Sequence, residues 1–240
     1  MGRCEFLNHS IITHRGIYNN ITIYENTIES IMYAIKNNLS ISIEIRMTKD
    51  NEIIVFNDEE MKRLIKLKDK VNSITKEELD YISHFHIPTL KEVLNMVDNK
   101  VPIIINIKED TKIFRNMLIE IIKDYKNNIA LQSIIVDCLK FYKKKDYIVG
   151  LIIDDDNNKI YLEKDIDVDF LTIKYNLIDK VKANILKMKY YIIGFTLETR
   201  EDVEFYIKMY NNLIIDNIEE VFKWLKHLLD QCLVEKQVLY

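Results

Sequence analysis

Glycine is scarce in this sequence of 240 residues, with four in all, at positions 2, 16, 150 and 194. Neither the glycine-rich fingerprint of a dinucleotide-binding fold nor a Walker-type phosphate loop can therefore be written anywhere along the chain. Proline occurs twice, at positions 88 and 102, and no stretch rich in proline, glycine or serine divides the chain. The sequence predicts a single domain over residues 1–240.

Cysteine is also scarce, and the three residues Cys4, Cys138 and Cys232 lie far apart. An odd number at such spacings makes neither a disulfide framework nor a set of zinc ligands, and it fits a reducing compartment. No uncharged apolar run approaches the roughly 20 residues that a membrane-spanning helix needs. We therefore expect a soluble, cytoplasmic protein without a membrane span.

Neither sign of charge predominates, since 34 basic residues stand against 38 acidic ones, for a formal net charge of -4. Without a basic stripe there is little to release counterions from a nucleic acid, so nucleic acid is not an expected partner. The hydrophobic share of 48% is that of a folded globular protein and excludes whole-chain disorder. The sequence gives no indication of oligomeric state.

Short β-branched runs alternate with longer runs of helical period, which is the pattern of a parallel sheet wound with crossover helices. The predicted strands are 11–14, 40–47, 53–57, 103–108, 132–137, 148–153, 169–174, 191–197 and 213–216. The predicted helices are 25–37, 89–97, 111–125, 139–144, 177–187, 200–209 and 218–233.

The pattern predicts an α/β fold, a single (β/α)8 barrel of the TIM type, with an open doubly wound sheet as second choice. One irregularity stands between the second and third strands, where residues 48–51 leave room for a turn and not for a helix. Nine predicted strands compete for eight places in such a barrel, so one of them must be peripheral or wrong.

Side chains at the carboxyl ends of barrel strands line the active-site face, which directs attention to the polar residues at the predicted strand ends. They form short blocks in a fixed order, namely His14-Arg15-Gly16, Glu25-Asn26-Thr27, Glu44-Ile45-Arg46, Asn57-Asp58 and Asn106-Ile107-Lys108. Two histidines, His84 and His86, precede the segment Ile87-Pro88-Thr89-Leu90, which is expected to begin a helix over this face.

The order of these blocks over residues 11–108 resembles the glycerophosphodiester phosphodiesterase family, whose members are phosphodiesterase barrels of the phosphatidylinositol-phospholipase-C-like type. Further along, Gly194-Phe195-Thr196 and Ile214-Ile215-Asp216 are similar to strand ends of that family. The resemblance implies metal-dependent hydrolysis of glycerophosphodiesters to glycerol 3-phosphate and an alcohol, and hence a place in lipid and glycerol metabolism.

The resemblance implies a role for each matching position. His14 corresponds to the first catalytic histidine, with Arg15 beside it, and Glu44 to the first metal-binding carboxylate. Arg46 and Asn106 occupy the places of the other two metal-binding carboxylates, and Asn57 that of the second histidine. The neighbouring polar residues are expected to support the site from outside; they are Glu25, Asn26 and Asp58.

Three altered positions predict that metal-dependent activity is reduced or lost, since Mg²⁺ and Ca²⁺ need several oxygen ligands and Asn57 cannot shuttle a proton. No cofactor is expected, with Mg²⁺ or Ca²⁺ at a vestigial Glu44 site if any metal site persists. One alternative is a weak phosphodiesterase with His14 as base; the other is a pseudoenzyme that binds a phosphorylated polyol or a protein partner.

Arg46 has two interpretations. It either replaces the missing cation and binds a substrate phosphate together with Arg15 and Lys108, or it pairs with Glu44 in a salt bridge that fills a vestigial pocket. A further hypothesis is that His84 or His86 replaces the histidine missing at position 57. The expected ligand is a small phosphorylated polyol or phosphodiester.

Overall fold

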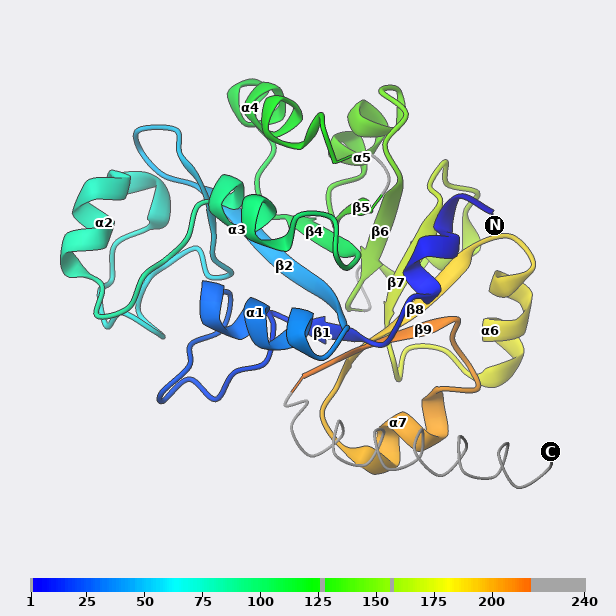
Figure 1. Cartoon of the computed structure of the whole chain (residues 1–240). Helices are drawn as coiled ribbons and strands as arrows, with labels where there is room; N and C mark the ends of the chain where they lie inside the picture. Colours follow the sequence, from blue (N-terminus) through cyan, green and yellow to red (C-terminus); the bar gives the residue numbers. More distant parts are fainter. Residues whose placement is uncertain (1, 126–127, 156–157, 217–240) are drawn as a thin grey trace.

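The computed structural model describes residues 2–125, 128–155 and 158–216, and the strands of this part form one closed barrel (Figure 1). Strand β1 pairs in parallel with both β2 and β9, which joins the two ends of the sheet. The barrel strands are β1 (Ile12–His14), β2 (Ser40–Met47), β4 (Ile103–Ile107), β5 (Ile129–Ser133), β6 (Val149–Ile153), β7 (Phe170–Lys174), β8 (Tyr191–Leu197) and β9 (Asn212–Ile215). The predicted (β/α)8 barrel is confirmed, and closure excludes the open sheet.

Helices connect most of the barrel strands, and several begin at a threonine whose hydroxyl caps the first turn. At Thr27 and Thr89 the capping is reciprocal, because a side chain three residues later returns a hydrogen bond to the cap backbone. The crossover helices are α1 (Ile28–Lys36), α3 (Leu90–Val97), α4 (Lys112–Ile122), α5 (Val136–Lys143), α6 (Lys180–Lys187) and α7 (Arg200–Tyr206). The predicted helix 218–233 lies outside the described residues.

The irregularity between the second and third strands is confirmed. Strand β3 (Ile53–Val55) runs antiparallel to β2 after a turn at residues 48–51, and it lies outside the barrel, which accounts for the ninth predicted strand. The chain then makes an excursion over residues 56–87 that includes η2 (Val71–Ser73) and α2 (Lys76–Ile82). The excursion has a small core of its own, built from Ile54, Phe56, Met61, Leu64, Val71, Leu79 and Ile87.

The predicted strand 132–137 is wrong at both ends. Strand β5 covers Ile129–Ser133, and α5 already begins at Val136. The Ser133 hydroxyl donates to the Ile107 carbonyl and accepts from the Ile135 amide, which ends the strand in a side-chain turn. The apolar run at 134–136 has the composition of a strand, but Ile134 is exposed. The elements α2, η1 (Gly2–Asn8) and η3 (Lys159–Glu163) were not predicted.

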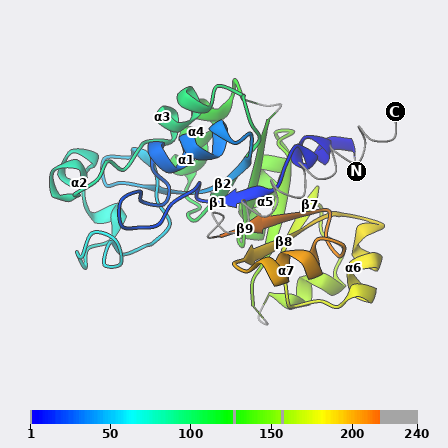
Figure 2. The same ribbon diagram turned by 60° about the horizontal axis from the view of Figure 1, so that its bottom comes forward.

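The amino end of the barrel is closed by the η1 segment, whose Cys4 and Leu7 pack among the first residues of the strands, including Ile12 and Phe170. Asn212 fastens the segment by donating from Nδ2 to the Leu7 carbonyl at 2.6 Å and to the Ser10 carbonyl at 2.8 Å. In Figure 2 the dark blue η1 segment lies next to β7, whose first residue, Phe170, belongs to the same cluster. The polar cavity described below therefore lies at the opposite, carboxyl end of the strands.

No helix within the described residues has the length and apolar character needed to cross a membrane.

Gly150 provides a test of packing inside the barrel. It pairs in register with Phe170 of β7, and a Cβ placed on it would lie 2.2 Å from the Phe170 ring. We expect Gly150→Ala to lower the free energy of unfolding by about 1–3 kcal/mol, because a fully buried ring has little space to move. Urea denaturation with an unchanged m-value measures this effect.

Gly2→Ala is the matched control, since a Cβ at Gly2 meets no atom within 4 Å. Its free energy of unfolding is expected to stay within about 0.5 kcal/mol of the parent. Equal stability of the Gly150 variant and the Gly2 variant would contradict the packing described for β6 and β7.

Candidate active site

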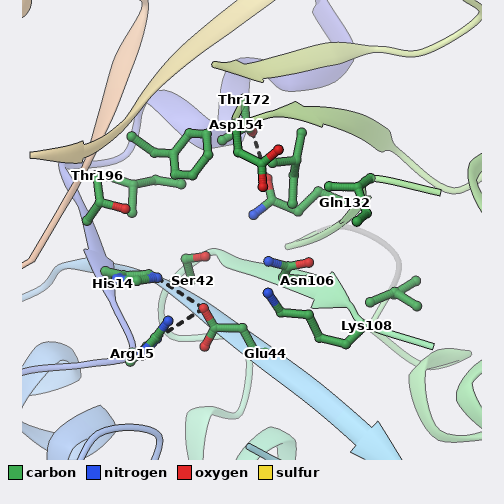
Figure 3. Close-up of a pocket in the computed structure, with 15 residues that line it drawn as sticks. His14, Arg15, Ser42, Glu44, Asn106, Lys108, Gln132, Asp154, Thr172 and Thr196 are labelled. Carbon is green, nitrogen blue, oxygen red and sulfur yellow. Dashed lines mark hydrogen bonds and ion pairs between the residues drawn. The ribbon is translucent and has the colours of Figure 1, made fainter. Parts of the chain in front are cut away.

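A cavity of about 250 Å³ opens among the carboxyl ends of the barrel strands (Figure 3). Charged side chains come from the first strands and from Asp154 after β6, while amides and hydroxyls come from the strands between and opposite them. The labelled lining residues are His14, Arg15, Ser42, Glu44, Asn106, Lys108, Gln132, Asp154, Thr172 and Thr196. Three of the predicted catalytic or phosphate-binding residues, His14, Arg15 and Lys108, therefore share one cavity with Glu44.

A tight turn after β1 places Arg15 over this cavity. Arg15 and Gly16 both adopt positive φ angles, 66° and 84°, and the Arg15 amide donates to the Ser42 carbonyl at 2.7 Å. A Cβ on Gly16 would lie 2.6 Å from the backbone of Ser30 in α1, so the approach of the turn to the helix requires glycine. The predicted block His14-Arg15-Gly16 is thus one structural unit.

The carboxylate of Glu44 is buried and occupied on both oxygens. Oε1 accepts from His14 Nε2 at 3.0 Å and from Arg15 Nε at 3.2 Å, while Oε2 accepts from Asn26 Nδ2 at 2.9 Å. Burial alone would raise the pKa of Glu44, but the charges of Arg15 and then His14 hold that pKa far below its usual range. Glu44 is therefore an ionised group whose counter-charges are side chains of this protein.

His14 lies between two carboxylates. Its Nε2 is 3.0 Å from Glu44 Oε1, and its Nδ1 is 3.0 Å from Asp216 Oδ2. Burial lowers the pKa of His14, but Glu44 and the hydrogen bond to Asp216 outweigh it and the net shift is upward. A proton on each ring nitrogen satisfies both contacts, so the geometry favours the imidazolium, a proton donor, over the base expected from the sequence.

Asp216 is a site residue that the sequence did not assign. It directly follows β9 (Asn212–Ile215), which neighbours β1 in the closed barrel, and it also accepts from the Tyr18 hydroxyl at 2.5 Å. The signal that could have found it is its position at the end of the last barrel strand, because barrel closure brings that end to His14.

Arg46 lies away from the cavity. Its Nε donates to the Asn57 carbonyl at 2.8 Å, and its Nη1 lies 3.6 Å from Glu109 Oε1. The two partners belong to the segments after β3 and β4, so Arg46 braces these segments and does not pair with Glu44. Asn57 also stays outside the lining, with its Nδ2 donating to Asp58 at 2.8 Å.

Lys108 extends into the cavity beside Asn106 (Figure 3). Burial lowers the pKa of Lys108, while the charge of Glu44 acts in the opposite direction. Among the described residues none forms a hydrogen bond or an ion pair with the ammonium group of Lys108. Lys108 is thus a cation of the cavity that lacks a direct partner, unlike His14 and Arg15.

Glu25 holds the Arg15 guanidinium from outside the cavity lining. The buried Glu25 carboxylate accepts from Arg15 Nη1 at 2.7 Å and from the guanidinium of Arg63, a residue that the sequence did not single out. Arg63 also donates to Asp58, so Glu25, Asn26 and Asp58 all support the site from outside the cavity lining.

Neither His84 nor His86 reaches the cavity lining. His84 contacts the Tyr24 hydroxyl at 2.9 Å, and His86 contacts Glu92 at 3.2 Å. The structure therefore gives neither histidine a place from which it could replace the residue at position 57.

The residues at the three expected metal-ligand positions do not fit a hard divalent cation. One is a guanidinium, one an amide, and the third is Glu44, whose two oxygens already accept three hydrogen bonds. Residues 2–125, 128–155 and 158–216 contain no group of three or more histidine, cysteine, aspartate or glutamate side chains arranged to hold a metal. Mg²⁺ and Ca²⁺ prefer several oxygen ligands with negative charge, and the residues at these three positions do not provide them.

The closed barrel carries His14 at the end of its first strand, Arg15 directly after it and the buried Glu44 on its second strand, which is the arrangement that the resemblance to phosphodiesterase barrels implies. The family model described as the glycerophosphoryl diester phosphodiesterase family matches residues 14–172, more than half of the chain. This protein belongs to that family, as its sequence predicts.

Known relatives agree with this assignment. A glycerophosphodiester phosphodiesterase of Bacillus altitudinis is 32% identical over 116 residues, which are 44% of this chain and 46% of that relative. The match thus spans less than half the length of this curated relative. The crystal structure of a glycerophosphodiester phosphodiesterase from Thermotoga maritima has a TM-score of 0.78 at 28% identity, covering 90% of this chain and 98% of that one.

A more distant structure shares the fold. It is an Oleispira antarctica phosphodiesterase in complex with the product sn-glycerol-3-phosphate, with a TM-score of 0.74 at 16% identity, covering 87% of this chain and 92% of that one.

The ion pairs of Glu44 yield a prediction on stability. Glu44→Gln leaves Arg15 and His14 facing a neutral group, so we expect the free energy of unfolding near pH 7 to fall by about 3 kcal/mol. Because the folded-state pKa of Glu44 is depressed, its ionic contribution is present above the unfolded value of 4.5 and is lost as the pH falls below it. Urea denaturation of both proteins between pH 7 and pH 3 should show the difference shrinking on acidification.

Glu120→Gln is the control, because Glu120 pairs with Lys123 in an exposed ion pair worth at most about 1 kcal/mol. A Glu44 variant whose deficit did not change with pH would show that lost packing, and not lost charge, explains its stability.

Proposed function

We propose that this protein binds the phosphate group of a small phosphorylated polyol or glycerophosphodiester at the mouth of its barrel, without a divalent ion. In this proposal hydrolysis by the metal-dependent route of the family is reduced or lost. The observation that carries the proposal is the pairing of Glu44, whose carboxylate lies 3.0 Å from His14 Nε2 and 3.2 Å from Arg15 Nε.

Lys108 supports an anionic ligand. Protonated His14 is paired with Glu44 and Asp216, and Arg15 with Glu44 and Glu25, so these two cations already have carboxylate partners. Lys108 has no direct partner among the described residues, so an incoming phosphate would find an ammonium group whose hydrogen bonds are free. Charge-assisted hydrogen bonds of this kind are among the stronger ones in proteins.

The remaining lining supports hydroxyl groups on the ligand. Thr172 donates to Gln132 Oε1 at 2.7 Å, which leaves the Gln132 amide nitrogen to serve the cavity together with Asn106 and Ser42 (Figure 3). Amides and hydroxyls both donate and accept, which suits the hydroxyl groups of a polyol. The Oleispira antarctica relative, whose complex holds sn-glycerol-3-phosphate, is consistent with such a ligand here.

The losses at positions 57 and 106 are what reduce catalysis in this proposal. A positioned acid or base contributes about 3–5 kcal/mol to a barrier, and a bound metal several more. Asn57 cannot carry a proton near neutral pH, and its side chain lies outside the cavity lining. We place the protein and its ligand in the cytoplasm, because the free cysteines Cys4 and Cys138 fit a reducing compartment.

A weak phosphodiesterase is the second candidate function. It is favoured by the contact of His14 with Asp216, which keeps a protonated imidazole at the cavity. In this alternative a water molecule would attack the phosphorus and lose a proton to solvent as the P–O bond to the alcohol breaks. His14 would give its Nε2 proton to the departing alkoxide, while Arg15 and Lys108 hold the phosphate oxygens.

Binding without metal is tested by isothermal titration calorimetry with sn-glycerol 3-phosphate in buffer containing EDTA. We expect saturable binding that added Mg²⁺ or Ca²⁺ does not strengthen, and a roughly 10- to 100-fold weaker affinity for Lys108→Met. Lys140→Met is the control, because Lys140 is an exposed residue of α5 paired with Asp137. Absence of heat with both this ligand and glycerophosphodiesters would refute the proposal.

Catalysis is tested with the triple variant Arg46→Asp, Asn57→His, Asn106→Glu, assayed on glycerophosphodiesters with and without Mg²⁺, Ca²⁺ or Mn²⁺. We expect metal-dependent hydrolysis by the variant at least roughly 100-fold above the natural protein, since both a proton carrier and carboxylate ligands return. Adding His14→Ala to the variant should abolish the gain. Robust turnover by the natural protein in EDTA would instead support the second candidate function.

A further inference from the structure

We propose that Arg63 is a positioning residue for the phosphate-binding Arg15, acting through the carboxylate of Glu25. The inference rests on the proposed function, because it names the residue that orients the Arg15 guanidinium of that site. Arg63 belongs to the excursion after β3, whereas Arg15 and Glu25 belong to the loop between β1 and α1. The excursion therefore helps to shape the mouth of the barrel without contributing a side chain to the cavity lining.

The contacts form a continuous chain of opposite charges. Arg63 grips Glu25 with both terminal nitrogens, Nη1 to Oε2 at 2.7 Å and Nη2 to Oε1 at 2.5 Å. Its Nε donates to Asp58 Oδ2 at 2.8 Å. On the other side Glu25 Oε1 accepts from Arg15 Nη1 at 2.7 Å, and Arg15 Nε reaches Glu44. Arg63 thus links Asp58 to Glu25, both outside the cavity lining, and Arg15 links Glu25 to Glu44, which lines the cavity.

The division of contacts on Arg15 explains why Arg63 matters for a ligand. Arg15 uses Nε for Glu44 and Nη1 for Glu25, which leaves Nη2 without a hydrogen bond among the described residues. Glu25 is almost fully buried, so its negative charge needs close compensation. Without Arg63 that compensation would fall mainly on Arg15, which would turn toward Glu25 and away from the cavity.

The local fold holds Arg63 in place. Met61 and Leu64, on either side of it, are buried in the small core of the excursion, so the backbone at Arg63 is fixed by packing. The side chain is 44% exposed, which leaves its guanidinium accessible from solvent on one side. A lysine at this position has one ammonium group and could not link Glu25 and Asp58 with the same fork geometry.

The experiment compares Arg63→Ala, Arg63→Lys and the natural protein in calorimetry with sn-glycerol 3-phosphate. We expect affinity to fall roughly 10-fold or more in both variants, and to recover in Arg63→Ala when millimolar guanidinium, but not ammonium, is added. Recovery is the result that a merely structural role would not give, because a small cation cannot restore a lost backbone arrangement. Arg115→Ala is the control, since Arg115 forms a similar two-pronged pair with Asp110 outside the cavity lining.

A second readout does not need a ligand. The Nε–Hε signal of Arg15 in nitrogen-15 NMR, assigned through Arg15→Lys, reports the contact with Glu44. We expect it to shift or broaden in Arg63→Ala and to return with guanidinium. If the natural protein binds no phosphate ligand while this signal responds, the proposed function fails and the positioning role stands. If the signal and the affinity are both unchanged in Arg63→Ala, the positioning role is refuted; loss without guanidinium rescue refutes it as well.

Discussion

The ionised carboxylate of Glu44 is the group on which the geometry of the cavity depends. A buried negative charge is costly unless it is paired and hydrogen-bonded. Here the pairing comes from His14 at the end of β1 and from Arg15 on the turn that follows. That requirement holds the turn against β2 and keeps the His14 ring between two carboxylates. Glu44 therefore organises the cationic side chains at the carboxyl ends of the first two strands.

Negatively and positively charged side chains alternate outward from Glu44. Arg15 faces both Glu44 and Glu25, and Glu25 in turn faces Arg63 from the excursion. Glu44 lies on β2, Arg15 and Glu25 lie in the loop between β1 and α1, and Arg63 lies in the excursion, so the series joins three segments of the chain. Arg46 plays a comparable mechanical part nearby, since it links the segments after β3 and β4 through Asn57 and Glu109. Arg46 thus acts as a brace between two loops.

The sequence predicts the barrel because its alternation of strands and helices is a local signal, and the predicted bounds of β2 and β8 agree with the structure. It misplaces β5, because the exposed Ile134 and its apolar neighbours have strand composition while the Ser133 hydroxyl ends the strand. His14, Arg15, Glu44 and Lys108 could be gathered into one cavity because each follows or ends a strand. Asp216 could be added only by taking barrel closure into account, because its partner His14 lies 202 residues away in the chain. Arg63 gave no such signal, because it lies in the excursion and follows no barrel strand. Arg46 shows a further limit of prediction from the sequence. Residues 44 and 46 of one strand were expected to share a face and to form a salt bridge, but Arg46 contacts Asn57 and Glu109 instead.

The antiparallel hairpin of β2 and β3 has a consequence for how the family can vary. It carries the chain out of the barrel before the excursion begins, and α3 brings it back to β4. The excursion can therefore vary while the barrel register stays intact, provided that its contacts with the loop before α1 are kept, namely Arg63 with Glu25 and Phe85 with Tyr24. Diversity near the mouth can then arise by changes in this excursion, and the barrel strands would need no accompanying substitution.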